Sequence, residues 1–137
     1  MVRFLSVAWI DALSEAAARA APPAVTEAIG VEVVVEPASG ADDDRVAWHL
    51  IAAPDGLTLR AGRLPGALVT LTADVATAAE LAQGHANAQR ALDRGRLHLR
   101  GDLGDLARAR AALDALGDVF ASVRADTDFT VAAPRST

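Results

Sequence analysis

The stretch 67–84, ALVTLTADVATAAELAQG, changes its pattern halfway along. Residues 67–73 are β-branched and apolar and predict a strand, with no clear sign of which side faces the core. Asp74 is a typical helix-capping residue, and residues 75–83 then predict a helix that ends at Gly84, where a left-handed glycine is common. This change from strand to helix predicts a domain of mixed α and β structure.

The chain before this stretch alternates between apolar and polar residues. Val31, Val33 and Val35 share one side of a predicted strand, whereas Glu32 and Glu36 share the other. Two further strands follow, joined by Pro-Asp-Gly at 54–56, and Asp-Gly predicts a tight hairpin with positive φ angles.

The complete order of elements predicts the fold class. The expected elements are a helix at 4–20, strands at 31–37, 45–53, 57–61 and 67–73, helices at 75–83 and 87–93, a strand at 96–100, and a helix from 103 to about 123. Gly117 is where we expect any interruption of the last helix. Strands followed by helices predict an α+β fold, with an antiparallel or mixed sheet and helices gathered on one face. We expect one domain over residues 1–125 and a tail over 126–137.

Composition excludes several classes of protein. The chain has no Cys, so disulfides and thiol chemistry are excluded, and its three His residues lie too far apart in sequence to predict a metal site. Its net charge is −5 and it has no basic patch, so nucleic-acid binding is not expected. No apolar run approaches the roughly 20 residues of a membrane span, so we expect a soluble, cytoplasmic protein without membrane insertion. All 13 basic residues are Arg, which indicates GC-rich, actinobacterial coding.

The sequence carries no pattern of a catalytic centre. No Ser lies in a nucleophile motif, and His49 and His98 fall on strand faces opposite the apolar ones. The glycines fit turns and helix ends, and no Gly-rich run precedes a helix in the phosphate-binding pattern. We therefore expect neither an enzyme nor a bound cofactor or metal.

Several segments together resemble the sterol carrier protein type two family, particularly its bacterial members. The most specific is 93–103, DRGRLHLRGDL, which is similar to the family's "small-Gly-basic-Leu-x-Leu-x-Gly-Asp" segment. The opening 4–13, FLSVAWIDAL, resembles its first helix, and residues 48–62 and 69–84 resemble its hairpin and next unit. The resemblance spans about residues 4–120.

The resemblance implies a five-stranded, mainly antiparallel sheet with helices over one face, and an apolar tunnel between the layers for a sterol, fatty acid or acyl lipid. The candidate ligand-binding residues are Trp9, Leu13, Trp48, Leu50, Leu59, Leu71, Leu81, Ala88, Ala91, Leu92, Leu113, Leu116 and Phe120. Two alternatives remain open. These side chains would also form an ordinary packed core, and the family also supplies accessory modules without an exchangeable lipid, which work with a partner enzyme. A homodimer is open as well.

Overall fold

The computed structural model describes residues 2–37, 45–85 and 88–129. The elements are β1 (Val2–Arg3), α1 (Val7–Arg19), β2 (Ile29–Glu36), β3 (Val46–Ala53), β4 (Gly56–Ala61), β5 (Val69–Asp74), α2 (Val75–Gln83), α3 (Ala88–Asp93), β6 (Leu97–Arg100), α4 (Leu103–Arg108), α5 (Arg110–Arg124) and β7 (Thr127–Asp128). The predicted loop at 38–44 and residues 130–137 of the predicted tail (126–137) lie outside the described residues, whereas residues 127 and 128 of that tail form β7.

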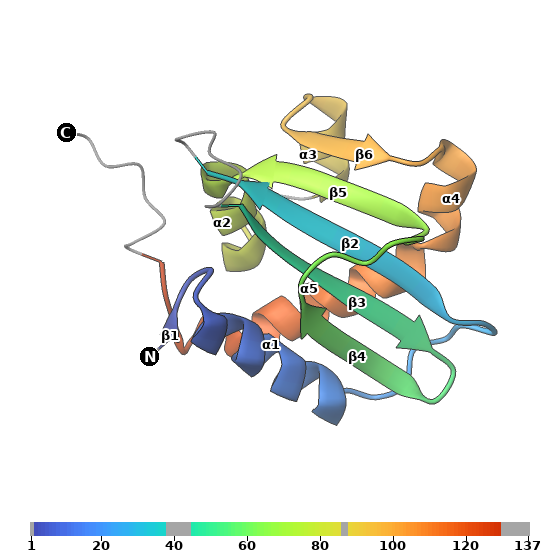
Figure 1. Ribbon diagram of the computed structural model, residues 1–137, viewed down its shortest axis with the longest axis horizontal. Helices are drawn as coiled ribbons and strands as arrows, with labels where there is room; N and C mark the ends of the chain where they lie inside the picture. Colours follow the sequence, from blue (N-terminus) through green and yellow to red (C-terminus); the bar gives the residue numbers. More distant parts are fainter. Residues whose placement is uncertain (1, 38–44, 86–87, 130–137) are drawn as a thin grey trace.

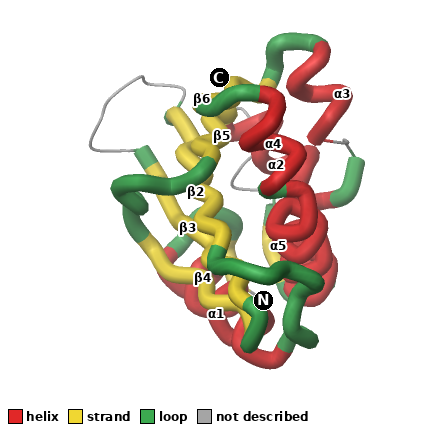
Figure 2. The backbone as a smooth tube through the Cα atoms, turned by 90° about the vertical axis from the view of Figure 1, so that its right-hand side faces the viewer, coloured by secondary structure: helices red, strands yellow, loops and turns green. Residues whose placement is uncertain are grey.

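The main sheet has five strands in the order β4-β3-β2-β5-β6. Its neighbouring strands run antiparallel except for β2 and β5, which are parallel. Figure 2 shows this sheet nearly edge-on, with α2, α4 and α5 on one side of it. The predicted α+β fold with a five-stranded, mainly antiparallel sheet is therefore confirmed.

The helix-facing side of the sheet is formed by the apolar positions of each strand. Val31, Val33 and Val35 of β2 are all buried there. The register sets Val33 beside Trp48 of β3 and beside Leu71 of β5, so these three side chains form one row across the sheet. Alternation predicted the helix-facing side correctly for β2 and β3. For β5, where the sequence left the side open, the structure places Leu71 and Ala73 on the helix-facing side.

The opposite side of the sheet is crossed by the segment 62–68, which we call the crossover. Because β4 is an edge strand and β5 lies beyond β2, the chain between them passes over β3 and β2, as Figure 1 shows from this side. Backbone hydrogen bonds hold both ends of the crossover, from Gly62 N to Ala47 O (2.9 Å) and from Leu68 N to Gly30 O (2.9 Å). The sheet is therefore partly covered on both faces.

Two details of the predicted chain path are wrong. The hairpin between β3 and β4 turns at Pro54 and Asp55, because Ala53 pairs with Gly56, and Asp55 does not adopt a positive φ. Gly117 lies within α5, and the helix breaks instead at Ala109. Ala109 is completely buried, and a capping box between Asp102 and Asp105 fixes α4 separately from α5.

The described ends of the chain lie together. Val2 and Arg3 of β1 pair in parallel with Thr127 and Asp128 of β7. Phe129 continues this contact, with its ring centroid 5.2 Å from that of Phe4. Within the described residues, no helix has the length and apolar character needed to cross a bilayer.

Candidate functional site

An apolar pocket of about 160 Å³ lies between the sheet and the helices. Three helices and four strands contribute to its walls. The lining residues are Trp9 from α1, Val33, Trp48, Leu71, Ala73 and Leu97 from the sheet, Ala78 and Leu81 from α2, and Leu113, Leu116, Gly117 and Phe120 from α5. We call this space the inner pocket.

The lining follows from the periodicity of the elements. On α5, Leu113, Leu116 and Phe120 recur at helical spacing and so face the sheet together. On α2, Asp74 caps the helix by accepting a hydrogen bond from Thr77 N (2.7 Å), and Leu81 follows on the pocket side. Short side chains at Ala73, Ala78 and Gly117 leave the space that longer ones would fill.

Three aromatic rings form one wall of the inner pocket. The ring of Trp48 stands nearly perpendicular to that of Trp9, at 84° and 5.2 Å between centroids, and to that of Phe120, at 81° and 6.4 Å. Trp9 and Phe120 are nearly parallel, 6.0 Å apart. Because Trp9 and Phe120 lie on α1 and α5, this cluster also joins the two helices to the sheet.

The mouth of the inner pocket lies between α2 and α5. Trp9 and Trp48 are each only 1% exposed. In contrast, Leu81, Leu113 and Phe120 are partly exposed and Gly117 is exposed. A Cβ atom added at Gly117 would meet nothing within 4 Å, so the rim is open at this point.

The inner pocket offers a ligand almost no polar contact. None of its lining side chains is ionisable. Among the described residues, the indole Nε1 of Trp48 is the buried side-chain nitrogen or oxygen without a hydrogen-bond partner. Nor do these residues include a group of three or more His, Cys, Asp or Glu that would hold a metal ion. The site therefore suits an apolar group and not an ion.

The structure brings seven of the predicted ligand-binding residues to the inner pocket. They are Trp9, Trp48, Leu71, Leu81, Leu113, Leu116 and Phe120. Leu13, Leu50, Leu59 and Ala91 lie in the surrounding core, Leu92 packs against that core, and the side chain of Ala88 lies outside the described part of the chain. That the seven contact a ligand remains a prediction.

Sequence reasoning missed five lining residues. They are Val33, Ala73, Ala78, Leu97 and Gly117. Strand alternation placed Val33 and Leu97 on the inner face, and helical spacing relates Ala78 to Leu81. No sequence signal distinguished the glycine at the rim from a helix-breaking one.

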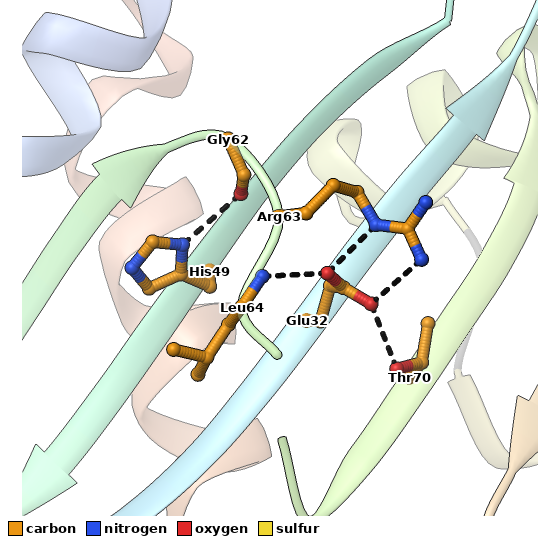
Figure 3. Close-up of polar contacts among 6 residues, drawn as sticks. All are labelled: Glu32, His49, Gly62, Arg63, Leu64 and Thr70. Atoms are coloured by element: carbon orange, nitrogen blue, oxygen red, sulfur yellow. Dashed lines mark hydrogen bonds and ion pairs between the residues drawn. The ribbon is translucent and has the colours of Figure 1, made fainter. Parts of the chain in front are cut away.

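The outer face of the sheet carries a polar network around Glu32. This side chain is buried in the middle of β2, and it accepts hydrogen bonds from Arg63 Nε (2.7 Å), Leu64 N (2.7 Å) and Thr70 Oγ1 (2.9 Å), as Figure 3 shows. Arg63 Nη2 adds a fourth bond of 3.2 Å. Burial would raise the pKa of Glu32, but the hydrogen bonds from Arg63, Leu64 and Thr70 outweigh burial and lower the pKa from 4.5.

This network fastens the crossover to the sheet. His49, next to Glu32 on β3, contacts the carbonyl oxygen of Gly62 through Nδ1 at 3.0 Å (Figure 3). Every oxygen of the Glu32 carboxylate is already bonded to the protein, and Arg63 is half exposed above it. We read the network as structural, because its buried charge is neutralised and its hydrogen bonds are satisfied.

The comparisons with known proteins agree with the fold. A model of the SCP-2 sterol transfer family matches residues 10–114. Among solved structures, the chain is similar to sterol carrier protein 2, at 25% identity and a TM-score of 0.64 over 85% of this chain and 96% of that one. It is also similar to a conserved hypothetical protein of Thermus thermophilus, a candidate sterol carrier protein, at 25% identity and 0.58 over 88% and 89%.

A more distant likeness concerns the fold alone. Palmitated SCP2L2 from Aedes aegypti matches at 20% identity and a TM-score of 0.56, over 76% of this chain and 88% of that one. A search of curated protein sequences found no significant match.

Proposed function

Because the chain belongs to the SCP-2 sterol transfer family, we propose that it binds an apolar lipid-like ligand in the inner pocket and transfers it. Family membership places the chain among lipid-binding and lipid-transfer proteins in general. The observation that supports this particular site is a pocket with twelve lining residues, none of them ionisable, that opens between two helices.

The size of the inner pocket favours a slender ligand. Its volume of about 160 Å³ is close to that of an engineered cavity of about 150 Å³ that binds benzene, and it lies below the roughly 300–1,000 Å³ of drug-sized sites. A six-carbon segment fits the pocket as it stands. Of a sterol, a fatty acid and an acyl lipid, we therefore favour a ligand that inserts the end of an acyl chain.

The expected affinity follows from the buried area. Each buried CH₂ contributes roughly 0.8 kcal/mol, so a six-carbon segment gains about 5 kcal/mol before the costs of association. Without those costs this gain would correspond to a dissociation constant of about 0.2 mM, and the costs of association make the expected affinity weaker than that limit. A longer chain would bind more tightly if α2 and α5 separate to admit it.

The proposal is tested by ligand uptake. Protein purified without a lipid-removing step is examined by native mass spectrometry and lipid extraction, and stripped protein is titrated with fluorescent fatty acids. We expect a copurified apolar molecule or saturable uptake. Neither signal, together with no perturbation of pocket methyl resonances by benzene, would contradict the proposal.

Substitution of Leu116 by Trp locates the ligand. Leu116 is buried in the pocket wall, so the added ring atoms should fill the space and abolish uptake while the protein stays folded. If the site were packed core instead, overpacking would cost about 1–3 kcal/mol of stability. Leu103→Trp, at a residue that is 81% exposed, is the control and should leave both uptake and the thermal midpoint unchanged.

An accessory module that binds a partner enzyme is the alternative, and the described surface gives it no specific support. Val7 and Leu103, the large apolar side chains exposed in the described part of the chain, begin different helices that lie well apart in Figure 1. A wild-type protein that takes up no apolar ligand but captures a single enzyme would favour this alternative.

A further inference from the structure

A second concave site, of about 620 Å³, lies where α2, α3 and the residue before β6 meet. We call it the arginine pocket, and its lining residues are Glu80, Gly84, His85, Arg90, Ala91, Arg94 and Arg96. It is distinct from the inner pocket but adjacent to it, because Leu81 and Leu97 line the inner pocket whereas their neighbours in sequence, at positions 80 and 96, line the arginine pocket.

The lining of the arginine pocket has a surplus of positive charge. It contains three arginines and one carboxylate, in a chain whose net charge is −5. The carboxylate of Glu80 is already paired with Arg96, at 2.6 Å. Arg94 makes no side-chain hydrogen bond or ion pair with another described residue. Asp93, the acidic residue next to it in sequence, is not part of the lining. The pocket therefore attracts anions.

The helix ends beside the pocket do not account for its arginines. Basic side chains often lie near the end of a helix, where they bond to the last carbonyl oxygens. In α2, the carbonyl oxygens of residues 80–82 already accept hydrogen bonds of 2.9–3.1 Å from His85 N, Gly84 N and Arg124 Nε. In α3, those of residues 90–92 accept backbone hydrogen bonds of 2.9–3.1 Å. Neither helix needs an arginine side chain from the pocket to complete its end.

The donors of the arginine pocket fit a phosphate group. A guanidinium presents a planar fork of N–H donors that matches two phosphate oxygens, and it keeps further donors when one partner is already bound. A phosphate monoester carries a charge of about −1.5 to −2 at neutral pH and three acceptor oxygens, so it can bond to several arginines at once. The three arginines are exposed and can reach such a group without disturbing the core. The volume also leaves room for the molecule that carries the phosphate.

We propose that the arginine pocket binds a phosphate group, which belongs either to a soluble phosphate compound or to the headgroup of a phospholipid. Arg94 donates to the phosphate oxygens. Arg96 borders the site and is held by Glu80 and by a contact of its Nη2 with Thr77 Oγ1 at 3.4 Å. This second site goes beyond the proposed function and does not depend on the inner pocket.

Two probes distinguish the two sources of phosphate. Inorganic phosphate is titrated into ¹⁵N-labelled protein while the backbone amide signals of Gly84, His85 and Ala91 are followed. In a separate experiment, the protein is floated with vesicles of phosphatidylcholine alone or mixed with phosphatidic acid, whose headgroup is a phosphate monoester. We expect inorganic phosphate to move the three amide signals saturably. Flotation that requires phosphatidic acid would assign the phosphate to a lipid headgroup, and its absence would assign it to a soluble compound.

Arg94→Gln is the test variant, and Arg60→Gln is its matched control. Loss of Arg94 should weaken phosphate binding about tenfold, the lower end of the range for one hydrogen bond to a charged group. Arg60 is exposed on β4, at the opposite edge of the sheet from β6, so its substitution makes the same change in net charge without touching the site. Both positions are exposed, and equal thermal midpoints would verify that both variants fold.

The outcomes decide between a site and an ordinary charged surface. Binding that Arg94→Gln weakens and Arg60→Gln does not supports the proposal. If neither probe shows binding that depends on Arg94, the proposal is overturned and the arginines are solvated surface residues. Equal weakening in the two variants also overturns it, because the attraction would then depend on net charge alone. Either negative result leaves the proposed function of the inner pocket standing.

Discussion

The two faces of β2 are both buried, but in different ways. On the inner face, Val31, Val33 and Val35 meet helices, and the packing leaves a pocket of about 160 Å³. On the outer face, Glu32 lies beneath the crossover, and each of its carboxylate oxygens accepts hydrogen bonds from the protein. Beneath the helices the inner face is apolar and incompletely filled, whereas beneath the crossover the outer face holds a buried carboxylate whose hydrogen bonds are satisfied.

This contrast indicates a division of work within one sheet. A short segment such as the crossover buries little apolar surface, so directional bonds to Glu32 must hold it in place. Helices bury much more apolar surface, and the inner face can therefore tolerate a void. We expect the outer face to contribute fixed geometry and the inner face to contribute a site that accepts a guest.

The largest expected effect tests how unevenly the inner face is packed. Leu50 is 1% exposed and away from the pocket, so Leu50→Ala should reduce the free energy of unfolding by about 3–4 kcal/mol. Leu116 borders the void and has fewer contacts to lose, so Leu116→Ala should cost only about 2 kcal/mol. Urea denaturation of both variants measures the difference. Equal losses would mean that the packing around the pocket is as tight as elsewhere.

Removal of the outer carboxylate should have the next largest effect. Glu32→Ala leaves Arg63, Leu64 N and Thr70 without their acceptor and should reduce the free energy of unfolding by about 2–3 kcal/mol. Glu36→Ala is the matched control on the same face of β2, where an exposed pair with Arg45 (3.6 Å) should be worth under ~1 kcal/mol. Similar losses of stability in the two variants would mean that the buried Glu32 network holds the crossover no better than an exposed ion pair would.

Acid should weaken the outer face selectively. Because the folded pKa of Glu32 lies below its ordinary value of 4.5, its contribution is complete above that value and is lost as the pH falls through the folded pKa. The stability gap between the wild type and Glu32→Gln should therefore be widest near neutral pH and narrow below about pH 4.5. Denaturation curves collected across that range measure the gap, and a constant gap would contradict the assignment.

The smallest effect concerns the rim of the inner pocket. Gly117 is exposed within α5 and has open space around its Cβ position, so Gly117→Ala should stabilise the protein by about 0.5–1 kcal/mol. Gly117→Leu places a larger side chain over the mouth and should slow uptake without loss of stability. Ala18→Leu, on the exposed side of α1, controls for added apolar surface. Unchanged uptake kinetics in Gly117→Leu would mean that the entrance to the inner pocket lies elsewhere.

The sequence predicted the inner face better than the outer one. Alternation identified Val33 and Trp48 as inward-facing, and helical spacing did the same for Leu116, because these patterns depend only on local geometry. The same alternation placed Glu32 on the opposite side from the valines but did not predict its burial. Its burial depends on the crossover from β4 to β5, which is set by strand order, and local periodicity carries no information about strand order.

The pocket itself was predictable only in part. Seven lining residues were expected from the strongest apolar positions, but the void depends on where small side chains coincide in space. Ala73 on β5 and Ala78 on α2 meet there although nothing in their local sequence distinguishes them from other alanines. The unpaired Nε1 of Trp48 likewise requires coordinates, because a tryptophan in a strand reveals its face but not its hydrogen-bond partners.

The pairing of β1 with β7 has a mechanical consequence for the helices. It ties the beginning of α1 to the end of α5, and Arg124 Nε donates to Ala82 O (2.9 Å), which ties the end of α5 to the end of α2. All three helices around the pocket are thus anchored at a single corner of the molecule. A ligand too large for the inner pocket should therefore displace α5 most at its first turns, which lie far from this corner, and least at its end, where Arg124 is held.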